Sequence, residues 1–152
     1  MNSNEKIYHH IRALFKIDTL PLGELEFEYS RKTGRIKNFS IGGKLFATLR
    51  PDGGLAITIF GARNLMNTNG FKENCVIPRT DCIPFVSEGR SLFSKHVEWC
   101  GSNVEVGSDV VIVDSNDNVL AVGRALLGAK AMKTYGKGVA VKVREGIKSR
   151  FD

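Results

Sequence analysis

Residues 84–97 (PFVSEGRSLFSKHV) place several polar side chains at a corner where an expected helix passes into an expected strand. Gly89 would let a sugar-phosphate backbone come close to the main chain, because glycine has no side chain in the way. Arg90 can donate two N–H groups to one phosphate, and the hydroxyls of Ser91 and Ser94 can donate to phosphate or accept from a 2′-OH. The corner therefore predicts binding of a polyanion. The alternatives are that Gly89 is only a helix C-cap and that Arg90 is only a solvated surface residue.

These residues do not form a catalytic grouping. Ser94 and His96 lie two apart on one expected strand, and no third residue is placed to orient the imidazole. Gly136-Lys137 is similar to the end of a phosphate-binding P-loop, but Ala131 and Gly138 stand where that motif needs glycine and serine or threonine. We therefore expect no enzyme activity and no cofactor.

The cysteines also give no sign of a metal site. The spacing of Cys75, Cys82 and Cys100 matches neither CxxC nor a zinc ribbon, and the three histidines add no ligand cluster. We expect three reduced cysteines buried as small apolar side chains, with a Cys75–Cys82 disulfide as the alternative. No metal is expected.

The charges of this 152-residue chain are segregated along its length. The formal net charge is +6, with eleven basic and seven acidic residues in 1–74, three and seven in 75–123, and eight and two in 124–152. Such a chain presents basic faces that suit a polyanion, most commonly nucleic acid. The alternative is that the lysines only keep a small domain soluble.

The first half predicts a helix followed by an antiparallel meander. Apolar side chains recur at helical spacing over residues 4–16, with Ser3 or Asn4 as N-cap, and the period changes to two after residue 22. The expected strands are 24–29, 36–41, 44–49 and 55–60, followed by a short helix at 61–66. Residues 67–74 lack a regular pattern and separate an expected domain 1–72 from an expected domain 73–152.

The second half predicts many short strands and few helices. The expected order is strand 76–78, helix 81–88, strand 91–99, a hairpin of 109–114 with 118–127, helix 129–133 and strand 139–143. This order indicates an α+β fold with a small barrel-like sheet.

Nothing in the sequence predicts a membrane protein. The longest apolar runs are strand-sized, such as Val110–Val113, and residues 1–16 have charges and histidines where a signal peptide needs an apolar region. We expect a cytoplasmic protein with no membrane partner.

Three stretches of the second half carry a family resemblance. IPFVSEGRSLFSKHV, DVVIVDSNDNVLAVGRALL and GVAVKVREG follow one another within residues 75–147, which resemble a PUA domain, an RNA-binding module. GRIKNFSIGGKLFATLRPDGGLAITIFGARNL is similar to the small α+β domain that precedes PUA in several proteins. Together they resemble the C-terminal, tRNA-holding region of archaeal tRNA-guanine (archaeosine) transglycosylase. The chain shows no counterpart of that family's catalytic barrel.

The resemblance implies a mixed β pseudo-barrel of six strands with short helices. It also implies an RNA surface between the first helix with its following strand and the last long strand. Carried over to this chain, the implied RNA-binding residues are Gly89, Arg90, Ser91, Ser94, Lys95, Gly138, Val139, Ala140, Lys142 and Arg144.

Strand and helix geometry extend this set. Lys142 and Arg144 are two apart on a strand and share one face, so they form a basic ridge. Lys130 and Lys133, three apart on a helix, extend the ridge, and Arg79 completes the expected set. A solvated surface is the alternative for each. Phe93 and Trp99 could stack on bases, but we expect both to pack in the core.

We therefore expect a non-catalytic RNA-binding protein that acts in RNA modification or translation, with tRNA or another structured RNA as its partner. The alternative is an accessory subunit that recruits a separate transglycosylase-like RNA-modifying enzyme, or a factor that binds a ribosomal subunit.

Overall fold

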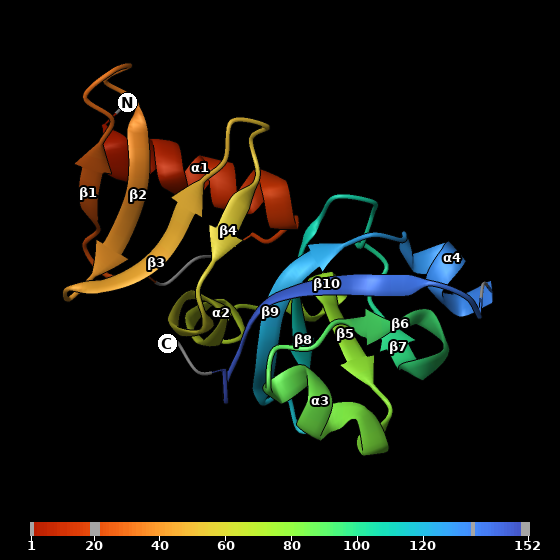
Figure 1. The fold of residues 1–152 in the computed structure, drawn as a ribbon. Coiled ribbons are helices and arrows are strands. Elements are labelled where there is room, and N and C mark those ends of the chain that lie inside the picture. Colours follow the sequence, from red (N-terminus) through yellow and green to blue (C-terminus); the bar gives the residue numbers. More distant parts are fainter. Residues whose placement is uncertain (1, 19–21, 135, 150–152) are drawn as a thin grey trace. The chain divides into compact units, whose positions relative to one another are not determined.

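The computed structural model describes residues 2–18, 22–134 and 136–149 and divides into two compact units, Met1–Phe71 and Lys72–Asp152 (Figure 1).

The first unit is a four-stranded antiparallel sheet with two helices, in the strand order β1-β2-β3-β4. Its elements are α1 (Ser3–Phe15), β1 (Glu26–Tyr29), β2 (Ile36–Ile41), β3 (Lys44–Leu49), β4 (Leu55–Ile57) and α2 (Ile59–Leu65). Its core contains the fully buried rings of Phe15, Phe39, Phe46 and Phe71. The predicted helix and meander are confirmed.

Two boundaries of the first unit differ from the prediction because of helix capping. The N-cap of α1 is Asn2, whose side chain accepts from the Glu5 N–H at 2.9 Å, rather than Ser3 or Asn4. The expected strand 55–60 ends at Ile57, since the Thr58 hydroxyl accepts from the Gly61 N–H at 3.0 Å and starts α2. The short helix therefore begins at Ile59.

The second unit is a mixed six-stranded sheet that curls into a nearly closed pseudo-barrel, in the order β6-β10-β9-β8-β5-β7 (Figure 1). Only the β5–β8 pair is parallel among the strands described. The strands are β5 (Cys75–Pro78), β6 (Leu92–Phe93), β7 (Val97–Cys100), β8 (Asp109–Val113), β9 (Val119–Ala125) and β10 (Val139–Gly146). The helices are α3 (Ile83–Ser87) and α4 (Ala129–Thr134), with 3-10 turns η1 (Phe71–Asn74), η2 (Thr80–Cys82) and η3 (Ser94–His96). The α+β class and the six-stranded pseudo-barrel are confirmed.

The expected strand 91–99 is wrong as a single element. It is divided into β6 and β7, which lie at opposite ends of the strand order, with η3 between them. The turn is held on both sides by main-chain bonds: the Ser94 N–H donates to the Gly138 carbonyl, and the Arg79 N–H to that of His96, each at 2.8 Å. The expected helix 81–88 likewise begins as the 3-10 turn η2 and continues as α3.

The three cysteines are free and buried, as predicted, and the alternative Cys75–Cys82 disulfide is absent from the structure. Burial raises the pKa of the Cys75 thiol to about 12 and that of the Cys100 thiol to about 11. No helix within the described part of the chain has the length and apolar character to cross a membrane.

Candidate nucleic-acid interface

The corner at the end of α3 is built as a helix C-cap. Gly89 has a φ of +99°, and its N–H donates to the Val86 carbonyl at 3.0 Å, while the Arg90 N–H donates to the Phe85 carbonyl at 3.0 Å. A Cβ at Gly89 would lie 2.7 Å from the Ser149 hydroxyl oxygen. The space beside Gly89 is therefore occupied by the chain itself, and the C-cap role explains this glycine.

Arg90 lies on the surface of this corner. Its guanidinium carbon is 5.6 Å from the centroid of the Phe85 ring, which is itself 49% exposed. Stacking on the ring orients the planar guanidinium without using its N–H groups, which stay available to a phosphate.

The two serines of the corner are tied to the last strand rather than offered to solvent. The Ser91 hydroxyl accepts from the Val143 N–H at 3.3 Å, and Ser94 is only 3% exposed. Ala140 is fully buried and Val139 half-buried. The side chains of Ser94 and Ala140 do not reach the surface. They can therefore affect binding only by fixing the position of the main chain.

The last strand carries the basic ridge. Lys142 and Arg144 are exposed while Val141 and Val143 are buried, so the predicted alternation along β10 is confirmed. β6 is the hydrogen-bonded neighbour of β10, with Val141 opposite Leu92, so the corner and the ridge adjoin one another in a single sheet.

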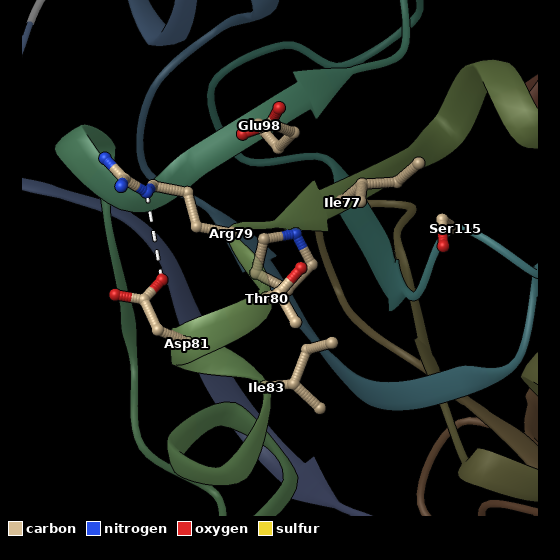
Figure 2. Close-up of a pocket in the computed structure, with 8 residues that line it drawn as sticks. Ile77, Arg79, Thr80, Asp81, Ile83, Glu98 and Ser115 are labelled. Carbon is tan, nitrogen blue, oxygen red and sulfur yellow. Dashed lines mark ion pairs between the residues drawn. The ribbon is translucent and has the colours of Figure 1, made fainter.

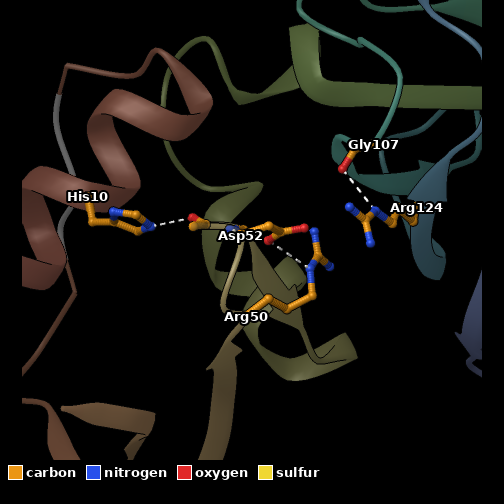
Figure 3. Close-up of polar contacts among 7 residues, drawn as sticks. His10, Arg50, Asp52, Gly107 and Arg124 are labelled. Atoms are coloured by element: carbon orange, nitrogen blue, oxygen red, sulfur yellow. Dashed lines mark hydrogen bonds and ion pairs between the residues drawn. The ribbon is translucent and has the colours of Figure 1, made fainter. Parts of the chain in front are cut away.

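The neighbouring strand adds a cation that the sequence prediction did not include. Arg124 of β9 lies directly opposite Lys142 and is exposed, and its Nε donates to the Gly107 carbonyl at 3.2 Å (Figure 3). Like charges directly opposite each other in a sheet are destabilising. On its other side Arg124 lies opposite Asp109 of β8, so it also has an acidic neighbour across the sheet. We call Arg90, Arg124, Lys142 and Arg144 the basic strip.

A second group of predicted residues lies at the start of β10. Gly138 has a φ of +81° with open space where a Cβ would stand, and it adjoins η3, which carries the exposed Lys95. Lys130 and Lys133 are exposed on α4, which packs against η3 and β7. From Gly138 to Arg144 the strand extends roughly 20 Å at ~3.3 Å per residue. Apart from Arg79 and Arg90, the predicted cations thus lie on β10 itself, on η3 at its start, or on α4, which packs against η3.

Phe93 adds an aromatic side chain to this surface. It is 48% exposed on β6, opposite Val139, and its ring meets that of His96 edge-on at 6.3 Å. The expectation that Phe93 packs in the core is therefore wrong, because β6 is an edge strand with one open face. Trp99 is half-buried, with the Lys72 ammonium 5.8 Å from its ring centroid.

Arg79 differs from the other predicted residues in its charge environment. Its Nε lies 3.8 Å from the Asp81 carboxylate, and both side chains line a pocket of about 500 Å³ together with Glu98 (Figure 2). The acidic neighbours make this pocket a poorer site for a phosphate than the basic strip.

Comparison with known proteins identifies both units. The PUA domain family matches residues 76–147, and the family described as patch-forming domain C2 of tRNA-guanine transglycosylase matches residues 10–70. The chain therefore carries a C2 patch-forming domain followed by a PUA domain.

The chain is homologous to the C-terminal region of archaeal tRNA-guanine(15) transglycosylases, as the sequence resemblance predicted. It is 36% identical over 132 residues to the enzyme of Methanobrevibacter smithii, covering 86% of this chain and 20% of the relative. It is 38% identical over 121 residues to that of Thermococcus onnurineus, covering 79% and 21%. The chain thus spans about a fifth of the length of these relatives.

Solved structures show the same fold. A conserved PUA domain protein from Thermoplasma acidophilum has a TM-score of 0.67 at 21% identity, covering 96% of this chain and 91% of its own. A hypothetical protein from Pyrococcus horikoshii has a TM-score of 0.69 at 18% identity, covering 96% and 90%.

Proposed function

We propose that this chain binds tRNA through the basic strip of its PUA domain and catalyses no reaction itself. The observation that carries the proposal is the opposed pair Lys142 and Arg124, exposed on adjacent strands and continued by Arg144 and Arg90. The fold keeps these cations together on β9, β10 and the α3 corner.

The mode of binding follows from these residue types. Exposed lysine and arginine side chains neutralise phosphates, whose released counterions make affinity depend strongly on salt. Arg90 on Phe85 and the exposed ring of Phe93 offer flat surfaces on which unpaired bases can stack. We therefore propose that the strip holds the RNA backbone and that a single-stranded end lies against the rings.

The expected result of charge reversal tests this function. In a gel-shift or filter-binding titration with tRNA, Arg90→Glu with Lys142→Glu should weaken affinity by at least about tenfold, because two phosphate contacts become repulsions. The charge-matched control is Lys44→Glu with Arg63→Glu, two exposed residues of the first unit. Equal affinity of the strip variant and the control would refute the proposal.

A second role is favoured by the extent of the homology. In the transglycosylases this region is part of a much longer polypeptide, and the chain corresponds to only about a fifth of it. We propose as the alternative that the chain supplies RNA binding to a separate RNA-modifying enzyme or to a ribosomal subunit. Co-purification of a tagged chain with either partner after nuclease treatment supports this role, and recovery of the chain alone argues against it.

A further inference from the structure

The first unit contains a pocket of about 830 Å³, within the range of ~300–1,000 Å³ that is typical of ligand sites. Three separate parts of the unit meet there: α1, the turn and strand that follow β1, and the turn between β3 and β4. The pocket lies wholly within the first unit and shares no residue with the basic strip.

The charged residues in the pocket wall are basic. Lys6, Arg35, Lys37 and Arg50 all contribute to its wall, and none of the described residues that line it is acidic. Lys37 has a carboxylate neighbour outside the wall, Glu28 at 3.8 Å, but both side chains are more than half exposed, so the pair is weak. No carboxylate is ion-paired with Lys6 or Arg35 within the described part of the chain.

The fold holds part of this wall in place. The Arg50 Nε lies 3.4 Å from the Asp52 carboxylate, and the His10 ring nitrogen Nε2 lies 2.6 Å from the Gly53 carbonyl oxygen (Figure 3). The first contact lies within the turn between β3 and β4, and the second holds that turn beside α1. Asp52 offsets part of the charge of Arg50, so the charge available to a ligand rests chiefly on Lys6, Arg35 and Lys37.

The pocket also offers a flat aromatic side chain. Tyr29 is 49% exposed at its edge, and its hydroxyl is 2.8 Å from that of Ser3. A tyrosine ring beside several cations combines a surface for base stacking with charges for phosphate, which suits nucleic acid in particular. A free inorganic anion would make no use of the ring.

We propose that this pocket is a second RNA-binding site, in which Lys6, Arg35 and Lys37 hold phosphodiester groups and Tyr29 stacks on a base. The inference rests on the proposed function, because it assumes that the PUA domain also binds RNA. It assigns to the first unit an RNA contact that uses none of the residues of the basic strip.

The test compares two double variants by the salt dependence of tRNA affinity, measured by fluorescence anisotropy. Lys6→Glu with Arg35→Glu should weaken binding by about tenfold and make the slope of log K against log salt shallower by about 1.5. Both residues are exposed, and a glutamate at position 6 lies in the first helical turn, where a negative charge is favourable. The control, Lys44→Glu with Arg63→Glu, should change neither quantity, and a thermal melt of each variant checks folding.

A second measurement locates the RNA. Ultraviolet cross-linking of the wild-type protein to tRNA, followed by mass spectrometry, should yield an adduct on the peptide that contains Tyr29. Excess unlabelled tRNA should abolish this adduct, while AMP and inorganic phosphate at the same phosphate concentration should not. If AMP or inorganic phosphate also abolishes the adduct, the proposal is overturned in favour of a site for small phosphorylated ligands.

The outcomes separate this inference from the proposed function. If the pocket variant matches the control while Arg90→Glu with Lys142→Glu impairs binding, only the second site is wrong. If the wild-type protein does not bind tRNA, both proposals fail.

Discussion

Individual side chains of the PUA domain divide into those that can meet a ligand and those that hold the fold. Ser94 and Ala140 are buried, and the Ser91 hydroxyl accepts a hydrogen bond from β10. Arg90 and Lys142, in contrast, are exposed. Residue type alone could not separate these groups. A serine hydroxyl can hydrogen-bond to an RNA backbone or to the protein's own main chain equally well.

Lys142 should affect stability and binding in opposite directions. Replacing it by glutamate turns the like-charged pair with Arg124 into an opposite-charged one, so the free energy of unfolding should rise by a few tenths of a kcal/mol. tRNA affinity should nevertheless fall several-fold, by less than in the double variant with Arg90→Glu. Denaturant unfolding and anisotropy titrations of Lys142→Gln and Lys142→Glu give a graded charge series. Affinity that does not follow the order Lys, Gln, Glu would argue against a phosphate contact.

Cys75 should make the protein sensitive to alkaline pH. Burial raises the pKa of its thiol from the ordinary 9.0 to about 12, so the folded protein keeps a proton that the unfolded chain releases. The resulting stabilisation is complete below pH 9 and is lost progressively as the pH rises from 9 towards 12.

The measurement is chemical unfolding between pH 8 and 11 of the wild type and Cys75→Ala. The free energy of unfolding of the wild type should fall more steeply with pH than that of the variant, even if the variant is less stable at pH 8 because of the cavity. Parallel curves would show that Cys75 does not titrate in this way.

Among the helices and strands, local sequence patterns predicted the elements whose contacts are with residues nearby in the sequence. α1 follows an amphipathic pattern, β2 and β3 surround a Gly-Gly turn, and the β8–β9 hairpin surrounds a polar turn. Their bounds agree with prediction to within a residue or two.

The errors concern partners that are distant in sequence. Residues 91–99 have the composition of one strand, but β6 pairs with β10 and β7 with β5, which only the completed barrel determines. Arg124 was missed for the same reason. Its position opposite Lys142 depends on the register of β9 with β10, and no local pattern encodes that register. Phe93 is exposed because β6 ends the strand order.

Two glycines at the ends of elements should respond differently to alanine. Both have positive φ values, +99° at Gly89 and +81° at Gly138, so each substitution should cost ~1–2 kcal/mol of backbone strain. Gly89→Ala also brings a methyl group against the Ser149 hydroxyl, whereas Gly138 opens onto free space. We expect Gly89→Ala to lose more stability in denaturant unfolding.

Binding should show the reverse order. Gly138→Ala should weaken tRNA affinity several-fold, because a methyl group would stand where an RNA backbone can approach the main chain. Gly89→Ala should leave affinity unchanged at a temperature where it is folded. If only Gly89→Ala loses affinity, the RNA backbone approaches the main chain at the α3 corner and not at Gly138.

At the scale of the whole molecule, the charges are distributed unevenly between and within the two units. Residues 75–123 are net acidic, yet residues 124–152 bring eight basic side chains to the same PUA domain, six of them between Arg124 and Arg144. The first unit has its own basic pocket. Each domain thus concentrates positive charge on part of its surface, and in both cases residues distant in sequence supply it.

The salt dependence of tRNA affinity distinguishes binding through the basic strip from binding by uncharged contacts. For the wild-type protein, log K should fall linearly with log salt between 50 and 200 mM, with a slope of about −0.7 to −0.9 for each phosphate contact. Arg90→Glu with Lys142→Glu should make that slope shallower by about 1.5. An affinity that does not change with salt, or a slope that the double variant leaves intact, would contradict binding through the basic strip.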